Sequence, residues 1–342
     1  MSTVALRLCG ASFRLARRVV LVNLLLALSV LVLLLSGLVG GTYPIAAADV
    51  VAAFQGASDP ITSMIVLENR LPRVVTALGV GLAFGLAGEM MQTLLRNPIA
   101  SPDIIGFTAG AGCGAVFTVA FLGTSTLVVP GALAGGLLSA ALVIGLSWQR
   151  GISPGQLVIT GIGVTMTLGV VTDLLMTRMD ATAAAALVKW LVGSLQARSL
   201  VEAKMLWIGL AILGPLALRH QFALARVSMS EEVATSLGVD ITRARLITLG
   251  LSVALVALAV AAAGPLPFVA FVAGPIAHGL NGKNRPTLLT AALVGAIITL
   301  SADAVSQLMP NGFGLPAGVF TALVGAPVLI WVLLVHYRKQ SS

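Results

Sequence analysis

Residues 70–106 read RLPRVVTALGVGLAFGLAGEMMQTLLRNPIASPDIIG, and this stretch decides the fold. Its apolar part is long enough to cross a bilayer, and it contains glycines at 79, 81, 85 and 88. Glycines at this density allow neighbouring helix backbones to approach closely inside a membrane. The stretch therefore predicts a central, buried membrane helix that ends in a tight turn around Asn97-Pro98.

Two polar side chains, Glu89 and Gln92, lie near the end of this predicted helix. Polar and charged groups are costly in hydrocarbon, so both are expected to face protein or water. We interpret them as candidates for lining a transport pathway. Glu89 has an alternative role, which is to pair with a basic group inside the protein.

The composition of the whole chain indicates a membrane protein. Of its 342 residues, 58% are hydrophobic and 9% are charged, whereas soluble domains carry about 25% charged residues. Each membrane span needs roughly 20 residues, which leaves room for about ten. The apolar runs are continuous rather than alternating, and in lipid such runs satisfy their backbone groups as helices. We predict an all-α, polytopic membrane protein whose residues 1–342 form a single transmembrane domain.

The first apolar run, 19–48, follows several arginines and contains no charge until its end. A cleavable signal peptide is one alternative, because the alanines at 46–48 suit a peptidase. The run exceeds the usual 7–15 residues of a signal-peptide core. We therefore expect a retained first span with a cytosolic N-terminus.

Nine further spans are expected, and one amphipathic segment at 179–198 is predicted to form a short helix on the outer surface. The span boundary at 263/266 is a brief interruption by glycine and proline, which suits a tight turn. The predicted spans lie near 72–95, 104–122, 127–148, 155–177, 203–219, 242–263, 266–280, 287–308 and 316–336.

The distribution of basic residues predicts which side of the membrane each loop faces. The net charge is +8, with 20 Lys and Arg residues. Ten spans place six of these cations outside and the other 14 inside, as expected from the inward bias of cations in membrane proteins. The predicted location is a plasma (inner) membrane with both termini cytosolic. The six outer cations are Arg70, Arg73, Arg178, Lys189, Arg198 and Lys204.

The longest predicted inner loop covers about 220–242 and contains a helix signal. Ser228 and Glu231 have the spacing of a capping box, and Gly238 is a typical residue just beyond a helix end. A short capped helix at this position is either a lever for a partner protein or an ordinary interfacial helix.

Three spaced motifs carry a resemblance to a known family. Arg70-Leu-Pro-Arg73, Gly88-x-x-x-Gln92 and Arg96-Asn-Pro-x-Ala-x-Pro-x-x-x-Gly106 resemble the signature of permeases from iron–siderophore and vitamin B12 ABC importers, with the ferric enterobactin type most similar. The likeness extends over most of the chain. It implies a fold like that of the vitamin B12 importer permease, ferric siderophore as cargo, and one half of a translocation pathway.

The resemblance also implies partners and site residues. The partners are a second, homologous but different permease, two ATPase subunits and an extracytoplasmic solute-binding protein. Arg70 and Arg73 are expected to dock the binding protein, although snorkelling anchors are the alternative. The implied coupling segment for the ATPase is Ser230, Glu231, Glu232, Val233, Ala234, Leu237 and Gly238. The implied gate residues are Ser153, Pro154 and Gly155, and the remaining motif positions are Asn97, Pro98, Pro102, Gly106, Pro275, Asp303 and Pro316.

Three positions depart from the family pattern. Glu89 stands where the family usually has a small or apolar residue, Ile276 stands in place of histidine, and His278 in place of arginine. For Asp303 we favour a structural role.

The sequence contains no catalytic or nucleotide-binding motif. No H-E-x-x-H, G-x-S-x-G or P-loop spacing is found. We therefore expect no enzyme activity and no cofactor, with ATP hydrolysis in a separate chain. The alternatives are a vitamin B12 or haem importer permease, a stand-alone secondary transporter and, more remotely, a membrane enzyme.

Overall fold

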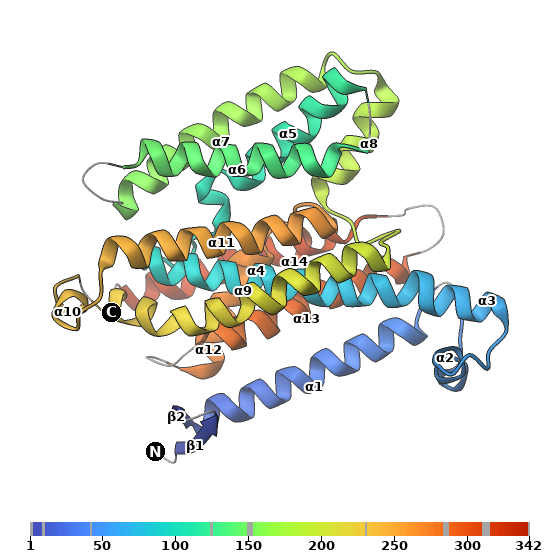
Figure 1. Cartoon of the computed structure of the whole chain (residues 1–342), viewed down its shortest axis with the longest axis horizontal. Coiled ribbons are helices and arrows are strands. Elements are labelled where there is room, and N and C mark those ends of the chain that lie inside the picture. Colours follow the sequence, from blue (N-terminus) through green and yellow to red (C-terminus); the bar gives the residue numbers. More distant parts are fainter. Residues whose placement is uncertain are drawn as a thin grey trace.

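The fold is a bundle of long helices with their axes roughly side by side (Figure 1). The structure is a computed structural model that describes residues 3–8, 11–41, 43–123, 126–148, 153–229, 231–282, 287–309 and 315–340. Its helices and strands are β1 Thr3–Leu8, β2 Ala11–Ala16, α1 Arg17–Val39, α2 Ala47–Phe54, α3 Pro60–Ser63, the π-helical η1 Met64–Arg70, α4 Leu71–Leu95, the 3-10 helix η2 Pro102–Ile105, α5 Phe107–Leu122, α6 Val128–Leu146, α7 Pro154–Met176, α8 Ala181–Val192, α9 Leu200–Val227, α10 Glu231–Ser236, α11 Ile241–Ala263, α12 Val269–Asn281, α13 Leu288–Leu308 and α14 Ala317–Gln340.

Helix α4 is the centre of the bundle, as predicted. Of its 25 residues 18 are buried, and it packs against α13, α11, α9 and α12. Its glycines explain the close packing. A Cβ atom on Gly85 would lie 2.3 Å from the carbonyl oxygen of Ala291 in α13, and one on Gly88 would lie 2.0 Å from that of Ala270 in α12.

Helices α5, α6 and α7 form a second group beside this core (Figure 1). Helices α5 and α6 pack through glycines on both sides. A Cβ atom on Gly135 would lie 2.3 Å from the carbonyl oxygen of Gly110, and one on Gly114 would lie 2.2 Å from that of Gly131. The group meets the core mainly where α6 packs on α11.

The expected number of spans agrees with the structure. In the part of the chain that the structure describes, seven helices are long and apolar enough to cross a membrane. Three shorter apolar helices, α5, α12 and α14, match the remaining predicted spans, and α8 matches the predicted surface helix at 179–198. The start of α1, the end of α14 and helix α10 lie at one end of the bundle, and α3 lies at the other (Figure 1). We call these the α10 end and the α3 end.

Two predicted boundaries near the N-terminus are wrong. The run 19–48 is not one helix, because α1 ends at Val39 and α2 begins only at Ala47. Gly41, with φ +137°, and Pro44 do not suit a continuing helix. The second span begins earlier than predicted, since α3 and η1 extend α4 back to Pro60, where the Asp59 side chain accepts a hydrogen bond from the Thr62 backbone N–H.

The predicted inner loop is longer than the one in the structure, because helix α9 extends into it. The helix continues to Val227 instead of ending near 219, so the loop is shorter than 220–242. Ser228 is the C-cap of α9 and donates to the Ala225 carbonyl at 2.8 Å, so it does not cap α10. A capping box does exist at the other end of α9, between Ser199 and Glu202. An antiparallel hairpin of β1 and β2, which was not predicted, precedes α1.

Candidate functional site

Helix α10 projects beyond the helices of the bundle (Figure 1). A small apolar cluster of Val227, Ala234 and Ala244 anchors it to the ends of α9 and α11. Gly238, at φ +75°, follows the helix, and its N–H donates to the Thr235 carbonyl at 2.9 Å. The glycine is therefore the terminator that the sequence predicted.

One face of the α10 segment is apolar and exposed. Met229, Val233 and Leu237 are spaced four residues apart and are 70%, 43% and 56% exposed. Glu232 is exposed beside them. Of the predicted coupling residues, Ala234 is therefore an anchor, while Glu232, Val233 and Leu237 face outward. Ser230 lies outside the described residues.

Arg70 is buried rather than exposed, with 5% of its surface accessible. Its guanidinium donates to the carbonyls of Leu38 at 2.9 Å and Val39 at 2.8 Å, and also to that of Tyr43. These carbonyls belong to the end of α1 and the turn that follows it. Arg70 therefore fastens α1 to the start of α4.

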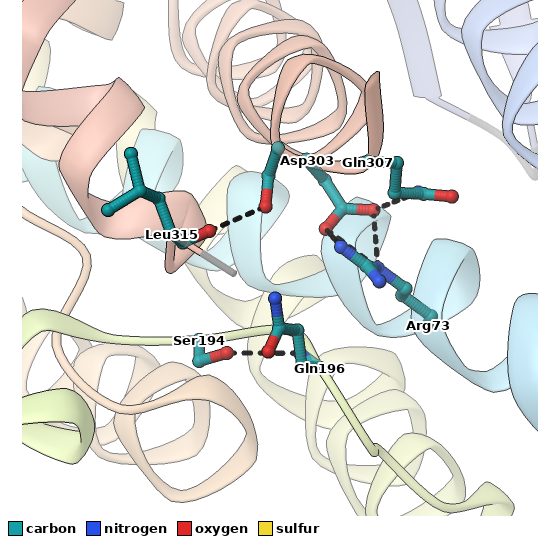
Figure 2. Close-up of polar contacts among 7 residues, drawn as sticks. Arg73, Ser194, Gln196, Asp303, Gln307 and Leu315 are labelled. Carbon is teal, nitrogen blue, oxygen red and sulfur yellow. Dashed lines mark hydrogen bonds and ion pairs between the residues drawn. The ribbon is translucent and has the colours of Figure 1, made fainter. Parts of the chain in front are cut away.

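Arg73 forms a buried ion pair with Asp303 of α13, as Figure 2 shows. The two side chains approach to 2.8 Å and are 15% and 3% exposed. Gln307, one turn further along α13, donates to the same carboxylate at 2.8 Å. This geometry agrees with the structural role expected for Asp303. Both guanidiniums bind groups inside the chain, and the expectation that Arg70 and Arg73 dock a binding protein stays a prediction.

Connecting segments meet close to this ion pair at the α3 end (Figure 2). Ser306 of α13 donates to the Leu315 carbonyl at 2.7 Å, next to Pro316, which precedes α14. The backbone N–H of Ser194 donates to the carbonyl of Ala263, at the end of α11. The Gly318 N–H donates to the Gly193 carbonyl at 3.2 Å, which joins the start of α14 to the segment after α8.

Glu89 is buried at 3% exposure and holds three polar groups. Its Oε1 lies 3.0 Å from Nε2 of His278 in α12, and it accepts hydrogen bonds from the hydroxyls of Thr93 and Thr287. Two of the departures from the family pattern, Glu89 and His278, therefore contact each other. This contact decides between the two roles considered for Glu89, in favour of pairing.

Gln92 is also buried, at 4% exposure, and its Nε2 donates to the Phe271 carbonyl at 3.0 Å and the Ala270 carbonyl at 3.3 Å. Glu89 and Gln92 both point at α12 within the same chain. Both side chains have intramolecular partners in this structure, and the expectation that they line a pathway stays a prediction.

The motif from Arg96 to Gly106 forms a tight connection between α4 and α5. Arg96, at φ +50°, ends α4 and donates to the Val227 carbonyl at 2.6 Å, while the Asn97 side chain accepts from the Ile99 N–H. Pro98 follows in the turn, and Pro102 begins η2. Gly106, at φ +74°, leads into α5, and its carbonyl accepts from Ser139.

Asp103 in η2 accepts hydrogen bonds from the hydroxyls of Ser101 and Thr108. Burial raises the pKa of this carboxyl above its ordinary value, although the two hydroxyls act in the opposite direction. Asp103 was not singled out from the sequence.

Helix α7 has little packing against the core. Ser153 and Gly155 at its start are exposed, and a Cβ atom on Gly155 would meet none of the described residues within 4 Å. Further along α7, Ile159, Met166 and Val170 are 74%, 69% and 68% exposed. The helix therefore presents a long apolar face on this chain, beginning at the predicted gate residues Ser153, Pro154 and Gly155.

Comparison with known proteins identifies the family. The FecCD transport family profile matches residues 27–335. The chain belongs to the FecCD transport family. This assignment confirms the resemblance read from the three motifs, and with it a multi-pass membrane protein that serves in transport.

Relatives of this FecCD member include ferric enterobactin transport system permease protein FepG of Escherichia coli (strain K12), 35% identical over 95% of this chain and 99% of the relative. Fe(3+)-citrate import system permease protein YfmE of Bacillus subtilis (strain 168) is 34% identical over 81% of this chain and 84% of the relative. A solved metal-chelate type ABC transporter in an inward-facing conformation has a TM-score of 0.81 and 26% identity, covering 92% of this chain and 98% of that one. The predicted fold class is therefore confirmed.

Proposed function

We propose that this FecCD family chain is one permease subunit of an ATP-driven importer for ferric siderophores of the catecholate, enterobactin-like type. The relatives support the class of cargo, because their names specify ferric enterobactin and ferric citrate. FepG, at 35% identity over almost its whole length, favours the catecholate type. Vitamin B12 and haem are the competing cargoes.

The observation that carries an ATP-driven mechanism is the exposed face of the α10 segment. Met229, Val233 and Leu237, which lie before, within and after the short helix α10, form an exposed apolar stripe along the anchored α10 segment. Such a stripe suits insertion into a groove of a partner protein. We assign this partner as an ATPase subunit, and place the α10 end, with both chain termini, in the cytosol.

The exposed face of α7 suits contact with a second permease, with the pathway between the two chains. Ser153, Pro154 and Gly155 would then lie at the inner mouth of that pathway. An extracytoplasmic binding protein delivers the cargo at the α3 end. Its expected docking residues are Arg70 and Arg73, which also bind groups within the chain.

The deciding experiment is uptake into proteoliposomes that contain the complex, its co-purifying ATPase and its binding protein, with ferric enterobactin outside. We expect accumulation that requires internal ATP and falls at least about tenfold in Leu237→Asp, because a carboxylate would be buried at the interface. Ala185→Asp, at an exposed position of α8, is the matched control. Accumulation driven by a proton or sodium gradient without ATPase would establish a secondary transporter instead. ATP-dependent uptake of cobalamin or haem alone would overturn the cargo but keep the mechanism.

A further inference from the structure

Helix α12 contains a proline in its interior, at Pro275. Proline has no backbone N–H, so the carbonyl four residues earlier, that of Phe271, loses its usual partner within the helix. The side chain of Gln92 from α4 donates to this carbonyl at 3.0 Å. A residue of the central helix thus replaces the hydrogen bond that Pro275 removes.

Glu89 contacts α12 on the other side of the same proline. His278 lies one turn after Pro275, and its Nε2 is 3.0 Å from Glu89 Oε1. Glu89 and Gln92 are three residues apart on α4 and therefore share one face of that helix. Thr287, which precedes α13, donates to the same carboxylate, so Glu89 also joins α12 to the start of α13.

Gly274 makes this double contact possible. A Cβ atom at this position would lie 1.9 Å from Gln92 Oε1 and 2.7 Å from Glu89 Oε2. The α12 backbone therefore rests directly on the two side chains, immediately before the proline. Among the described residues, neither of these two oxygens has a hydrogen-bond partner. The other polar atom of each side chain, Gln92 Nε2 and Glu89 Oε1, makes the contacts that hold it in place.

We propose that Glu89 and Gln92 are positioning residues that hold α12 at its proline break and thereby set the place of its last turn, 276–281, during transport. This role rests on the proposed function. The last turn contacts other elements at the α10 end, since Arg18 of α1 donates to the Leu280 carbonyl at 2.8 Å and Asn281 donates to Thr290 of α13 at 2.7 Å. Movement that begins at α10 reaches the pathway efficiently only if α12 moves with α4.

A double-mutant cycle between Gln92 and Pro275 tests this role, with cargo taken up per ATP hydrolysed as the readout in the proteoliposome assay. Gln92→Leu leaves the Phe271 carbonyl unpaired, and we expect a loss of about tenfold. Pro275→Ala returns the backbone N–H, so in that background Gln92→Leu is expected to change the ratio less than about twofold. Gln55→Leu, at an exposed position after α2, is the control for the substitution itself.

Equal losses from Gln92→Leu in both backgrounds would overturn the proposal, because Gln92 would then act independently of the proline. If Gln92→Leu does not fold, the milder substitutions Glu89→Gln and His278→Gln test the contact between Glu89 and His278. Additive losses of transport in the double variant would count against the proposal. If the wild-type complex shows no ATP-dependent uptake, the proposed function fails. The double-mutant cycle between Gln92 and Pro275 is then measured by thermal unfolding of the purified full chain. Additive changes in stability would show that the two residues do not act together.

Discussion

At the scale of single residues, the arginines of the Arg70-Leu-Pro-Arg73 motif show what a charge pattern leaves out. The sequence places both at the end of a span near 72–95, whereas the structure continues that helix back to Pro60. The pattern contains no information about the carbonyls at the end of α1 or about Asp303, which is 230 positions away. Partners that distant in sequence become neighbours only through the packing of α4 against α13 and α1.

Removing the charge of Asp303 is expected to destabilise the protein strongly. Asp303→Asn leaves the Arg73 guanidinium, whose side chain is 15% exposed, without its counter-ion. Breaking a buried pair in this way costs about 3–5 kcal/mol. Thermal unfolding in detergent measures the loss, with Asp173→Asn, an exposed acid of α7, as control. Equal melting temperatures for the two variants would show that the pair contributes little.

Asp103 is expected to make stability depend on pH. Because burial raises its pKa in the folded protein, ionisation is harder in the folded than in the unfolded state. Its contribution is therefore most favourable at low pH and is lost as pH rises from the unfolded value, about 3.9, through the folded one. We expect Asp103→Asn to raise the melting temperature at pH 7 and to have a smaller effect near pH 4. A variant less stable than wild type at both pH values would contradict this account.

At the scale of helices, the sequence predicted well which helices exist and in what order. It predicted less well where each helix begins and ends. Each of the ten apolar runs contains one long apolar helix, although the first run also reaches the start of α2. Continuous hydrophobicity in lipid leaves few alternatives to a helix. The ends depend on local side-chain hydrogen bonds, and here two similar signals competed. Ser228 and Ser199 both precede a glutamate by three residues, but only Ser199 forms the capping box, since Ser228 bonds back to α9.

This difference between the two serines gives a direct test. Ser199→Ala is expected to lower stability by about 1 kcal/mol, because the Glu202 N–H at the start of α9 loses its acceptor. Ser228→Ala removes only a bond from a hydroxyl to its own helix, so it should change stability by less than half as much. Chemical denaturation of the purified protein compares them. A larger effect at Ser228 would mean that it does cap α10.

At the scale of the whole molecule, the bundle consists of a core around α4 and a group of α5, α6 and α7 that packs on it less extensively. The glycines of α4 predicted the buried core from the sequence. The division into two groups was not predictable, because small residues occur in both and only the partner of each glycine distinguishes them. The candidate site was predictable in part. The α10 helix and the Arg96–Gly106 turn followed from the motifs, whereas the pairing of Glu89 with His278 required the fold.

Two glycines of α6 test the independence of the second group. Gly135→Ala places a Cβ atom 2.3 Å from the Gly110 carbonyl oxygen, while Gly145→Ala meets nothing within 4 Å. We expect Gly135→Ala to increase amide hydrogen exchange in α5 and α6 while α4 stays protected. Gly145→Ala should stabilise the helix by up to about 1 kcal/mol. Faster exchange throughout α4 in Gly135→Ala would indicate one cooperative unit instead.

The fastening of α1 has an evolutionary consequence. Arg70 binds the carbonyls of Leu38, Val39 and Tyr43, and Arg18 binds those of Gly279 and Leu280. Every residue type offers a carbonyl, so these contacts do not depend on which side chains stand at the five accepting positions. Substitutions at those positions therefore leave the hydrogen bonds to the arginines in place. Within this lineage, the five accepting positions can therefore change while the hydrogen bonds to the two arginines are kept.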